Sequence, residues 1–211
     1  MPHHRDFHFY EPSAGHGLPH SPFNAIIAPR PIGWISTVSA DGYVNLAPYS
    51  FFNAVASDPP CVMFAAGLRP EAPAFKDSQA NAEKTGEFVV NMATYDLRNE
   101  MNISSAGLPA GQNEFEAAGL EMLPSSMVKP PRVKGSPVHL ECKYLQTVKM
   151  PSWDPERGNY VIFGRVVGIH IADEVINDKG FVDVTRFRPI SRLGYMEYAV
   201  VNEVFVMNRP D

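Results

Sequence analysis

Pro29-Arg-Pro-Ile-Gly-Trp-Ile-Ser-Thr-Val-Ser-Ala-Asp-Gly-Tyr-Val-Asn-Leu-Ala-Pro-Tyr-Ser-Phe-Phe-Asn53 is the stretch that decides the fold. Two runs rich in β-branched and aromatic residues, 32–39 and 43–52, flank Asp41-Gly42. An Asp-Gly pair between such runs is a strong hairpin signal, because glycine accepts the positive φ that the turn requires. Pro48 breaks the second run, since proline cannot donate to a central ladder. The stretch therefore predicts an antiparallel hairpin.

The segments that follow extend this pattern along the chain. Short strands are predicted at 61–66, 88–92 and 203–207, and a period-two strand, half buried, at 138–144. The run 160–172 is a longer strand, in which Gly164 and Gly168 indicate bulges or barrel corners.

Helices are predicted between these strands. One spans 79–85, with Asp77 or Ser78 as its N-cap and Gly86 just past its end; another is capped by Thr94 and runs to about Asn102; a helical turn covers 114–118. Strands arrive in hairpins, and helices do not alternate with them one for one. The expected fold class is therefore mainly β, an antiparallel barrel with peripheral helices.

Composition limits the domain organisation and the partners. The 211 residues suffice for one large domain, and we expect an N-terminal arm at 1–24 followed by a single domain at 25–211. The net charge of −5, without a basic block, argues against a nucleic-acid partner. No apolar run is long enough for a bilayer, and no signal-peptide pattern opens the chain, so we expect a cytoplasmic protein without membrane contact.

Cysteine and histidine usage gives no metal or redox motif. Cys61 and Cys142 are read as reduced core thiols, with a single disulfide as the alternative. Five histidines fall within residues 1–20, but their spacing matches no compact ligand set, so no metal is expected. GxGxxG, GxxxxGK[ST], HExxH and GxSxG are all absent, which removes support for a Rossmann dinucleotide site, a P-loop, a zincin and a hydrolase elbow.

Two groups of residues could carry chemistry. In the hairpin, hydroxyls and an amide stand beside large rings, as a flat heteroaromatic ligand requires; the alternative is a barrel core whose hydroxyls bond to the backbone. Lys76-Asp77-Ser78 begins a helix, where free N–H groups and the dipole favour an anion; the alternative is an ordinary N-cap with a solvated lysine. Together the two groups favour a phosphorylated planar cofactor.

The chain resembles the flavin-reductase-like family over about residues 9–198. The resemblance is carried by Ala28-Pro-Arg-Pro-Ile-Gly-Trp-Ile-Ser-Thr-Val38, Asp41-Gly42, Asn45-Leu-Ala-Pro-Tyr-Ser-Phe-Phe-Asn53, Ser57-Asp-Pro-Pro60, Lys76-Asp-Ser78, Thr85-Gly-Glu-Phe-Val-Val-Asn91, Val128-Lys-Pro-Pro-Arg132, Ser136-Pro-Val-His-Leu-Glu-Cys142 and Arg192-Leu-Gly-Tyr-Met-Glu-Tyr198. It implies a Greek-key split β-barrel (an FMN-binding split barrel) with peripheral helices, a homodimer, and FMN held near the subunit interface.

The resemblance also implies the cofactor-binding residues. By position they are Trp34, Ser36, Thr37, Asn45, Ala47, Ser50, Phe51, Phe52, Lys76, Asp77 and Ser78. The last three should hold the phosphate, and Ser50–Phe52 should line the isoalloxazine edge. Ser78 replaces a threonine that is common in relatives and keeps the hydroxyl. Tyr195 stands where relatives often have glycine, and could narrow the space above the flavin.

The implied activity is an NAD(P)H-dependent flavin reductase, with hydride transfer to flavin N5 and NAD(P)H as co-substrate. Because the flavin ring carries this chemistry, no catalytic acid or base is assigned. The alternative is a flavin-binding electron-transfer protein without direct NAD(P)H activity. An oxygenase or another electron-acceptor protein is a possible partner in either case.

Overall fold

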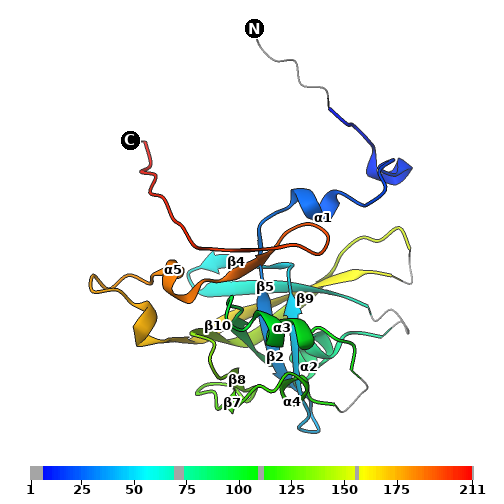
Figure 1. Cartoon of the computed structure of the whole chain (residues 1–211). Helices are drawn as coiled ribbons and strands as arrows, with labels where there is room; N and C mark the ends of the chain where they lie inside the picture. Colours follow the sequence, from blue (N-terminus) through cyan, green and yellow to red (C-terminus); the bar gives the residue numbers. More distant parts are fainter. Residues whose placement is uncertain (1–6, 69–73, 109–111, 155–156, 211) are drawn as a thin grey trace.

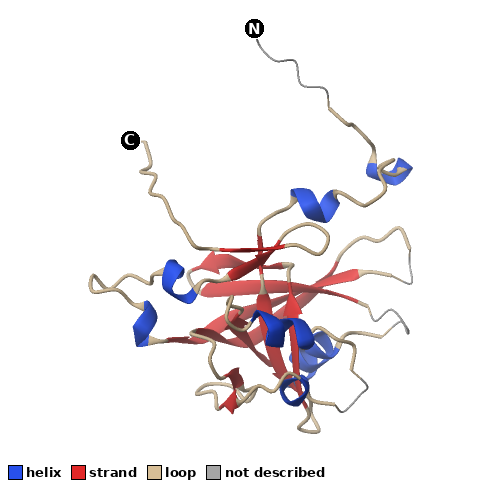
Figure 2. Cartoon of the chain, in the orientation of Figure 1, coloured by secondary structure: helices blue, strands red, loops and turns tan. Residues whose placement is uncertain are grey.

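The computed structural model describes residues 7–68, 74–108, 112–154 and 157–210. Its body is an antiparallel sheet in which seven strands follow the spatial order β3-β2-β6-β9-β10-β5-β4, and helices lie at the periphery (Figure 2). In chain order these strands are β2 (Gly33–Val38), β3 (Val44–Tyr49), β4 (Phe52–Ser57), β5 (Pro60–Gly67), β6 (Glu87–Met92), β9 (Val138–Lys149) and β10 (Asn159–Ile171).

A short connection forces this sheet to curl into a barrel. β3 and β4 lie at opposite ends of the strand order, yet only Ser50 and Phe51 separate them in the chain. A flat sheet would place them roughly 29 Å apart, at about 4.8 Å per strand step, whereas the three residue steps from Tyr49 to Phe52 reach at most about 10 Å. The two edges must therefore meet, and Ser50–Phe51 marks the seam where the barrel is split.

The remaining elements lie outside the seven-stranded sheet. Two small sheets pair β1 (Arg30–Pro31) with β11 (Ile190–Arg192) and β12 (Tyr198–Val200), and β7 (Met122–Leu123) with β8 (Arg132–Val133). The helices are α1 (Phe23–Ile26), α2 (Asp77–Thr85), α3 (Arg98–Ile103), α4 (Glu114–Ala117) and α5 (Val184–Phe187), with 3₁₀ turns η1 (Pro12–Ala14) and η2 (Asp173–Val175).

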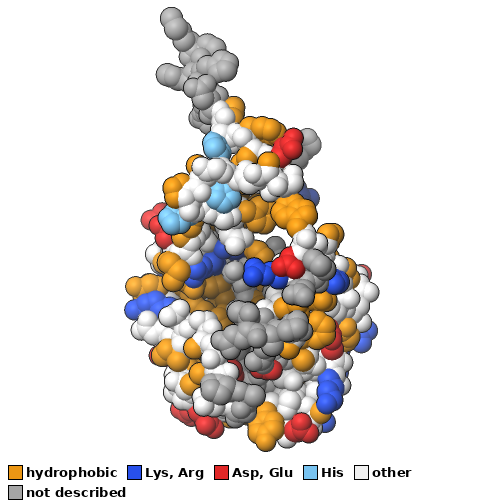
Figure 3. All heavy atoms as spheres, turned by 90° about the vertical axis from the view of Figure 1, so that its right-hand side faces the viewer, with side chains coloured by type: hydrophobic (Ala, Val, Ile, Leu, Met, Phe, Trp, Pro, Cys, Tyr) orange, Lys and Arg blue, Asp and Glu red, His pale blue; other side chains and the backbone are white. Residues whose placement is uncertain are grey.

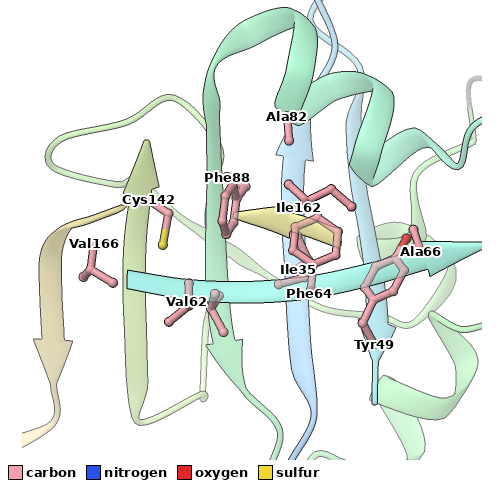
Figure 4. Packing of buried hydrophobic residues seen from close by; sticks show 11 residues of the cluster. Ile35, Tyr49, Val62, Phe64, Ala66, Ala82, Phe88, Cys142, Ile162 and Val166 are labelled. Carbon is pink, nitrogen blue, oxygen red and sulfur yellow. The ribbon is translucent and has the colours of Figure 1, made fainter. Parts of the chain in front are cut away.

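Alternating side chains of the hairpin divide the core into two clusters. Ile35 faces the barrel interior, where Tyr49, Phe64 and Phe88 pack with ring centroids 5.0 and 5.4 Å apart (Figure 4). Trp34 faces the other way, into a cluster beneath α3, α4 and β11. Full burial of one such side chain stabilises the fold by about 1.5–3 kcal/mol, so both faces of β2 are committed to packing.

Several predicted elements are confirmed. The hairpin, the strands at 61–66, 88–92 and 160–172, the α2 helix and the turn at 114–118 all form. β10 shifts its register against β9 between Phe163 and Gly164 and between Val166 and Gly168, as the glycine positions indicated. The N-cap of α2 is Lys76, which precedes both predicted caps, Asp77 and Ser78, and the helix ends at Gly86 with φ 75°.

Other predictions are wrong. Thr94 does not cap a helix; it pairs with Pro189 in an isolated β-bridge, so α3 begins later, at Arg98. Residues 203–207 form no strand, and Phe205 is 84% exposed, because no partner strand in the described chain lies beside them. The strand at 138–144 is longer than predicted and is covered on both faces, since His139 and Glu141 are also buried.

Residues 7–22 run away from the barrel at its N-terminal side (Figure 1). In the surface view the histidine side chains that can be seen lie on this arm, above the body (Figure 3). His8 contacts the carbonyl oxygen of His16 at 2.7 Å, while His3 and His4 lie outside the described residues. Cys61 and Cys142 are free thiols, of which Cys142 is buried and Cys61 half-buried. Throughout the described ranges, no helix is long and apolar enough to cross a membrane.

Candidate functional site

A buried polar cluster joins the hairpin to the start of α2. Asn45 lies opposite Thr37 in the β2–β3 register. The Asn45 side-chain amide donates to Ser78 Oγ at 2.9 Å and to Thr37 Oγ1 at 3.3 Å, and Asn81 Nδ2 donates to Thr37 Oγ1 at 3.1 Å. Thr37 and Ser78 are almost fully buried. The cluster holds the first turn of α2 against the barrel.

The start of α2 has the properties of an anion site. Lys76 is the N-cap in extended conformation, and its own side chain makes no capping hydrogen bond. The first-turn N–H groups of a helix have no intrahelical acceptor, and the dipole adds positive potential there. The exposed Lys76 ammonium group lies 5.7 Å from the Tyr49 ring centroid, beside the seam of the barrel. A lysine, a hydroxyl and helix N–H groups thus follow one another at the start of α2, and these are the types of donor that a phosphate requires.

Ser50, Phe51 and Phe52 form the seam next to this anion site. Ser50 and Phe51 lie in a bend outside both strands, and Phe51 is 36% exposed. Phe52 packs closely against β2, since a Cβ on Gly33 would lie 2.6 Å from its ring. Ala47 and Phe52 border the interior cluster. The seam therefore offers a partly open aromatic edge beside the polar cluster.

Two of the residues predicted as cofactor contacts lie on the other face of β2. Trp34 and Ser36 are fully buried on the face of β2 opposite Thr37. Trp34 donates its indole N–H to Ser104 at 2.9 Å, and Ser36 donates to the carbonyl oxygen of Pro131 at 2.5 Å. Successive side chains of a strand point to opposite faces, so the side chains of Trp34 and Ser36 point away from that of Thr37 and from the start of α2.

Two residues that sequence reasoning missed belong to this region. Asn81 follows Ser78 by three residues in α2, and this helical spacing places both on one face; the spacing could have predicted its role. Arg30 lies with its guanidinium 5.9 Å from the Phe51 ring centroid. It is 7% exposed and donates to the carbonyl oxygens of Ile27 and Leu193, at 2.6 and 2.8 Å. Arg30 thus ties the N-terminal segment and the β11–β12 loop to the seam.

Tyr195 lies in the β11–β12 loop with φ 54°, the left-handed region in which glycine carries no steric cost. Its ring is 53% exposed and stands 5.7 Å from the His20 ring. The side chain therefore points toward the N-terminal arm.

A second polar network lies on the Ser36 side of the barrel. Glu141 is fully buried and accepts N–H groups from Ser126 and Met127, and His170 Nε2 lies 2.5 Å from its Oε1. Burial alone would raise the pKa of Glu141, but the hydrogen bonds from Ser126 and His170 outweigh it and hold the pKa below the ordinary range. The network fixes the loop that precedes β8.

His139 belongs to the same network. Its Nδ1 lies 2.8 Å from Asn91 Oδ1, and the Asn91 amide donates to Ser36. Burial, with the nearby charge of Arg132, lowers the pKa of His139 to about 4. The ring is therefore neutral at pH 7. Within the described residues, no group of three or more histidine, cysteine or acidic side chains could hold a metal ion.

Comparison with known proteins places this arrangement in a family. The model of the flavin reductase like domain matches residues 27–191. An uncharacterized protein of Aquifex aeolicus is 40% identical over 173 residues, covering 82% of this chain and 85% of its own. The crystal structure of nitrilotriacetate monooxygenase component B from Bacillus cereus has a TM-score of 0.81 at 32% identity, with 88% and 90% of the two chains covered.

The same fold occurs at lower identity. The crystal structure of a putative flavin reductase with split barrel domain from Shewanella frigidimarina is 20% identical and has a TM-score of 0.77, with 89% of this chain and 90% of that chain covered. The barrel whose edges meet at Ser50–Phe51 is thus a split barrel. With the family model spanning most of the barrel and the anion site beside its seam, the chain belongs to the flavin reductase-like family.

Proposed function

We propose that this protein is an FMN-dependent oxidoreductase whose flavin is reduced by NAD(P)H. The observation that carries the proposal is the hydrogen bond between Asn45 and Ser78, because it holds a helix N-terminus and a lysine beside the aromatic seam. A phosphorylated planar cofactor needs both features side by side. Cationic and N–H donors bind the phosphate, and a partly open aromatic edge contacts the ring.

In this proposal the phosphate binds Lys76, the Ser78 hydroxyl and the first-turn N–H groups of α2. Thr37 and Asn45 support Ser78 and contact the ribityl chain, and Ala47 with Ser50–Phe52 borders the isoalloxazine ring. The Asp77 carboxylate would repel a phosphate, so we leave it out of the contacts. Bound flavin supplies the hydride chemistry, and the protein contributes position and hydrogen bonds.

The final acceptor of the electrons is proposed from the likeness to the Bacillus cereus protein, which is a component of a monooxygenase. We accordingly propose an oxygenase as partner. Anaerobic addition of NADH or NADPH to the FMN-loaded protein tests the reductase step: we expect loss of the visible absorbance of the bound oxidised flavin. Bound flavin that stays oxidised under both nucleotides would leave an electron-transfer protein as the function.

The phosphate contact is tested by Lys76→Ala. Removing a charge-assisted hydrogen bond should weaken FMN binding by about 1–3 kcal/mol. Riboflavin, which lacks the phosphate, should bind wild type and variant equally; fluorescence titration measures both. Lys84→Ala is the matched control, because Lys84 is exposed in the last turn of the same helix. An equal loss for FMN and riboflavin would remove Lys76 from the phosphate site.

A further inference from the structure

A pocket of about 370 Å³ lies between α3 and the β11–β12 pair, outside the cluster assigned to FMN. Its walls include Tyr95, Arg98, Asn102, Ile190, Arg192 and Tyr198. This volume falls in the range of small-molecule sites, which are mostly apolar with a few convergent polar groups. The composition of the walls shows which ligand chemistry the pocket favours.

The pocket is positively charged. Arg98 and Arg192 both line it, and no aspartate or glutamate is among its lining residues. Neither arginine forms an ion pair with a carboxylate in the part of the chain that the structure describes; the ion pair nearby joins Asp96 to Arg188 at 3.7 Å. In a chain with a net charge of −5, two uncompensated cations in one concavity indicate an anionic ligand.

Aromatic rings hold both guanidinium groups without neutralising them. Arg98 lies 4.0 Å from the ring centroid of Tyr95, and Arg192 lies 4.5 Å from that of Tyr198. Stacking on a ring fixes the plane of a guanidinium and leaves its charge intact. The cations are thus oriented in advance, which lowers the entropic cost of binding an anion.

Both arginines keep hydrogen-bond donors available. Arg98 donates one N–H to the carbonyl oxygen of Tyr95 at 2.6 Å, and Arg192 donates from Nη2 to that of Tyr195. A guanidinium carries five N–H groups in a planar fork that matches a carboxylate or a phosphate. Most of the donors therefore remain for a ligand.

A third cation, Arg30, lies behind the pocket. Arg192 is the cross-strand partner of Arg30, the buried arginine beside the seam. Burial, followed by the charge of Arg192, lowers the pKa of Arg30. Two like charges on adjacent strands repel each other, and an anion at Arg192 would relieve the repulsion.

We propose that this pocket binds a small organic anion, a carboxylate or phosphate on an apolar or aromatic frame, with Arg98 and Arg192 as the anion-binding pair. Apolar side chains, Met101 and Ile190 among them, contact the frame. The site goes beyond the proposed function, because it requires no flavin. Arg192 of this pocket pairs with Arg30, and Arg30 in turn contacts Phe51 at the seam.

Calorimetric titration of the full-length, flavin-free protein tests the proposal. Benzoate and phenyl phosphate are the anionic probes, and benzamide is the neutral one of the same shape. We expect saturable one-site binding of at least one anion and at least tenfold weaker binding of benzamide; the tighter anion identifies the charged group. Arg98→Gln and Arg192→Gln should each weaken the anion at least tenfold. Arg165→Gln, an exposed arginine on β10, should bind as wild type does.

Two further binding experiments distinguish this pocket from the proposed FMN site. Phenyl phosphate binding should persist in Lys76→Ala, and saturating FMN should leave the affinity for benzoate unchanged. Competition by FMN would assign the pocket to the cofactor and overturn the proposal. It would also be overturned by the absence of saturable binding for both anions, by equal binding of benzamide, or by arginine variants that retain wild-type affinity.

Discussion

Single residues decide how closely the strands of this barrel can approach. Gly164 lies at a bulge of β10, where a Cβ would stand 2.3 Å from the Phe88 ring inside the core. We predict that Gly164→Ala destabilises the protein by about 1–3 kcal/mol, because the ring has no free space to move into. Gly67→Ala is the control, since its Cβ would meet nothing nearer than 3.5 Å. Urea unfolding measures both variants, and an equal, small change in both would contradict the prediction.

Among the elements, β9 carries two buried ionisable side chains, His139 and Glu141, on the face that its sequence pattern predicted to be exposed. Glu141 binds the loop before β8. His139 carries a neutral ring there, with its pKa lowered from 6.5 to about 4 by burial and by Arg132. A histidine with a depressed pKa in the folded state contributes stability that is fully present above pH 6.5. As the pH falls toward 4, the unfolded chain takes up the proton first and this stability is lost.

We therefore predict a loss of about 3 kcal/mol between pH 7 and pH 4 from His139 alone. His139→Gln should remove most of this pH dependence, although it lowers stability at pH 7 as well. His20→Gln, on the exposed arm, should keep the wild-type profile. Urea unfolding at a series of pH values provides the comparison. A His139→Gln profile parallel to that of wild type would show that another group carries the dependence.

At the scale of the whole molecule, the seam leaves β4 as a terminal strand with an open face. All residues from Asn53 to Ser57 are exposed, and Val55 is 48% exposed at a bulge. We propose that a second copy of the chain covers this face, as the family resemblance implies, and predict a mass near twice 23.3 kDa in light scattering. Val55→Asp should shift the protein to the monomer, because a buried carboxylate without a partner is costly.

Met122→Asp is the control for this substitution. Met122 is 45% exposed in β7, which lies at the opposite end of the barrel body from β4 (Figure 1). A monomeric wild-type protein, or a dimer that both substitutions leave intact, would contradict an interface at β4.

Local sequence signals predicted the elements that depend on local geometry. Asp41-Gly42 predicted the hairpin because a tight turn needs positive φ. Gly164 and Gly168 predicted the bulges, and at Gly164 a Cβ would collide with the Phe88 ring. The helix cap predicted at Thr94 and the strand predicted at 203–207 were wrong, because propensity describes a residue without its tertiary neighbours. Pairing with Pro189 draws Thr94 into extended structure, and residues 203–207 have no strand beside them in the described chain.

The candidate site divides in the same way. Lys76 and Ser78 could be predicted from the pattern of a helix start, and Thr37 and Asn45 from hydroxyl and amide groups at paired positions of a hairpin. Trp34 and Ser36 were assigned to the site only by position in a motif. Successive side chains of β2 point to opposite faces, which could be predicted from the sequence, and this places Trp34 and Ser36 on the face opposite Thr37.

The sequence by itself determined the hairpin, the bulges and the helix start, because turn geometry and strand alternation act over a few residues. It also indicated the family, through motifs spread along the chain. Only the tertiary structure decided that β3 and β4 close a barrel, that Asn45 reaches Ser78, and that His139 and Glu141 are buried. It also gathered Arg98 and Arg192, 94 positions apart in the chain, at one pocket. Contacts between distant segments depend on the packing of the whole chain, which no local pattern encodes.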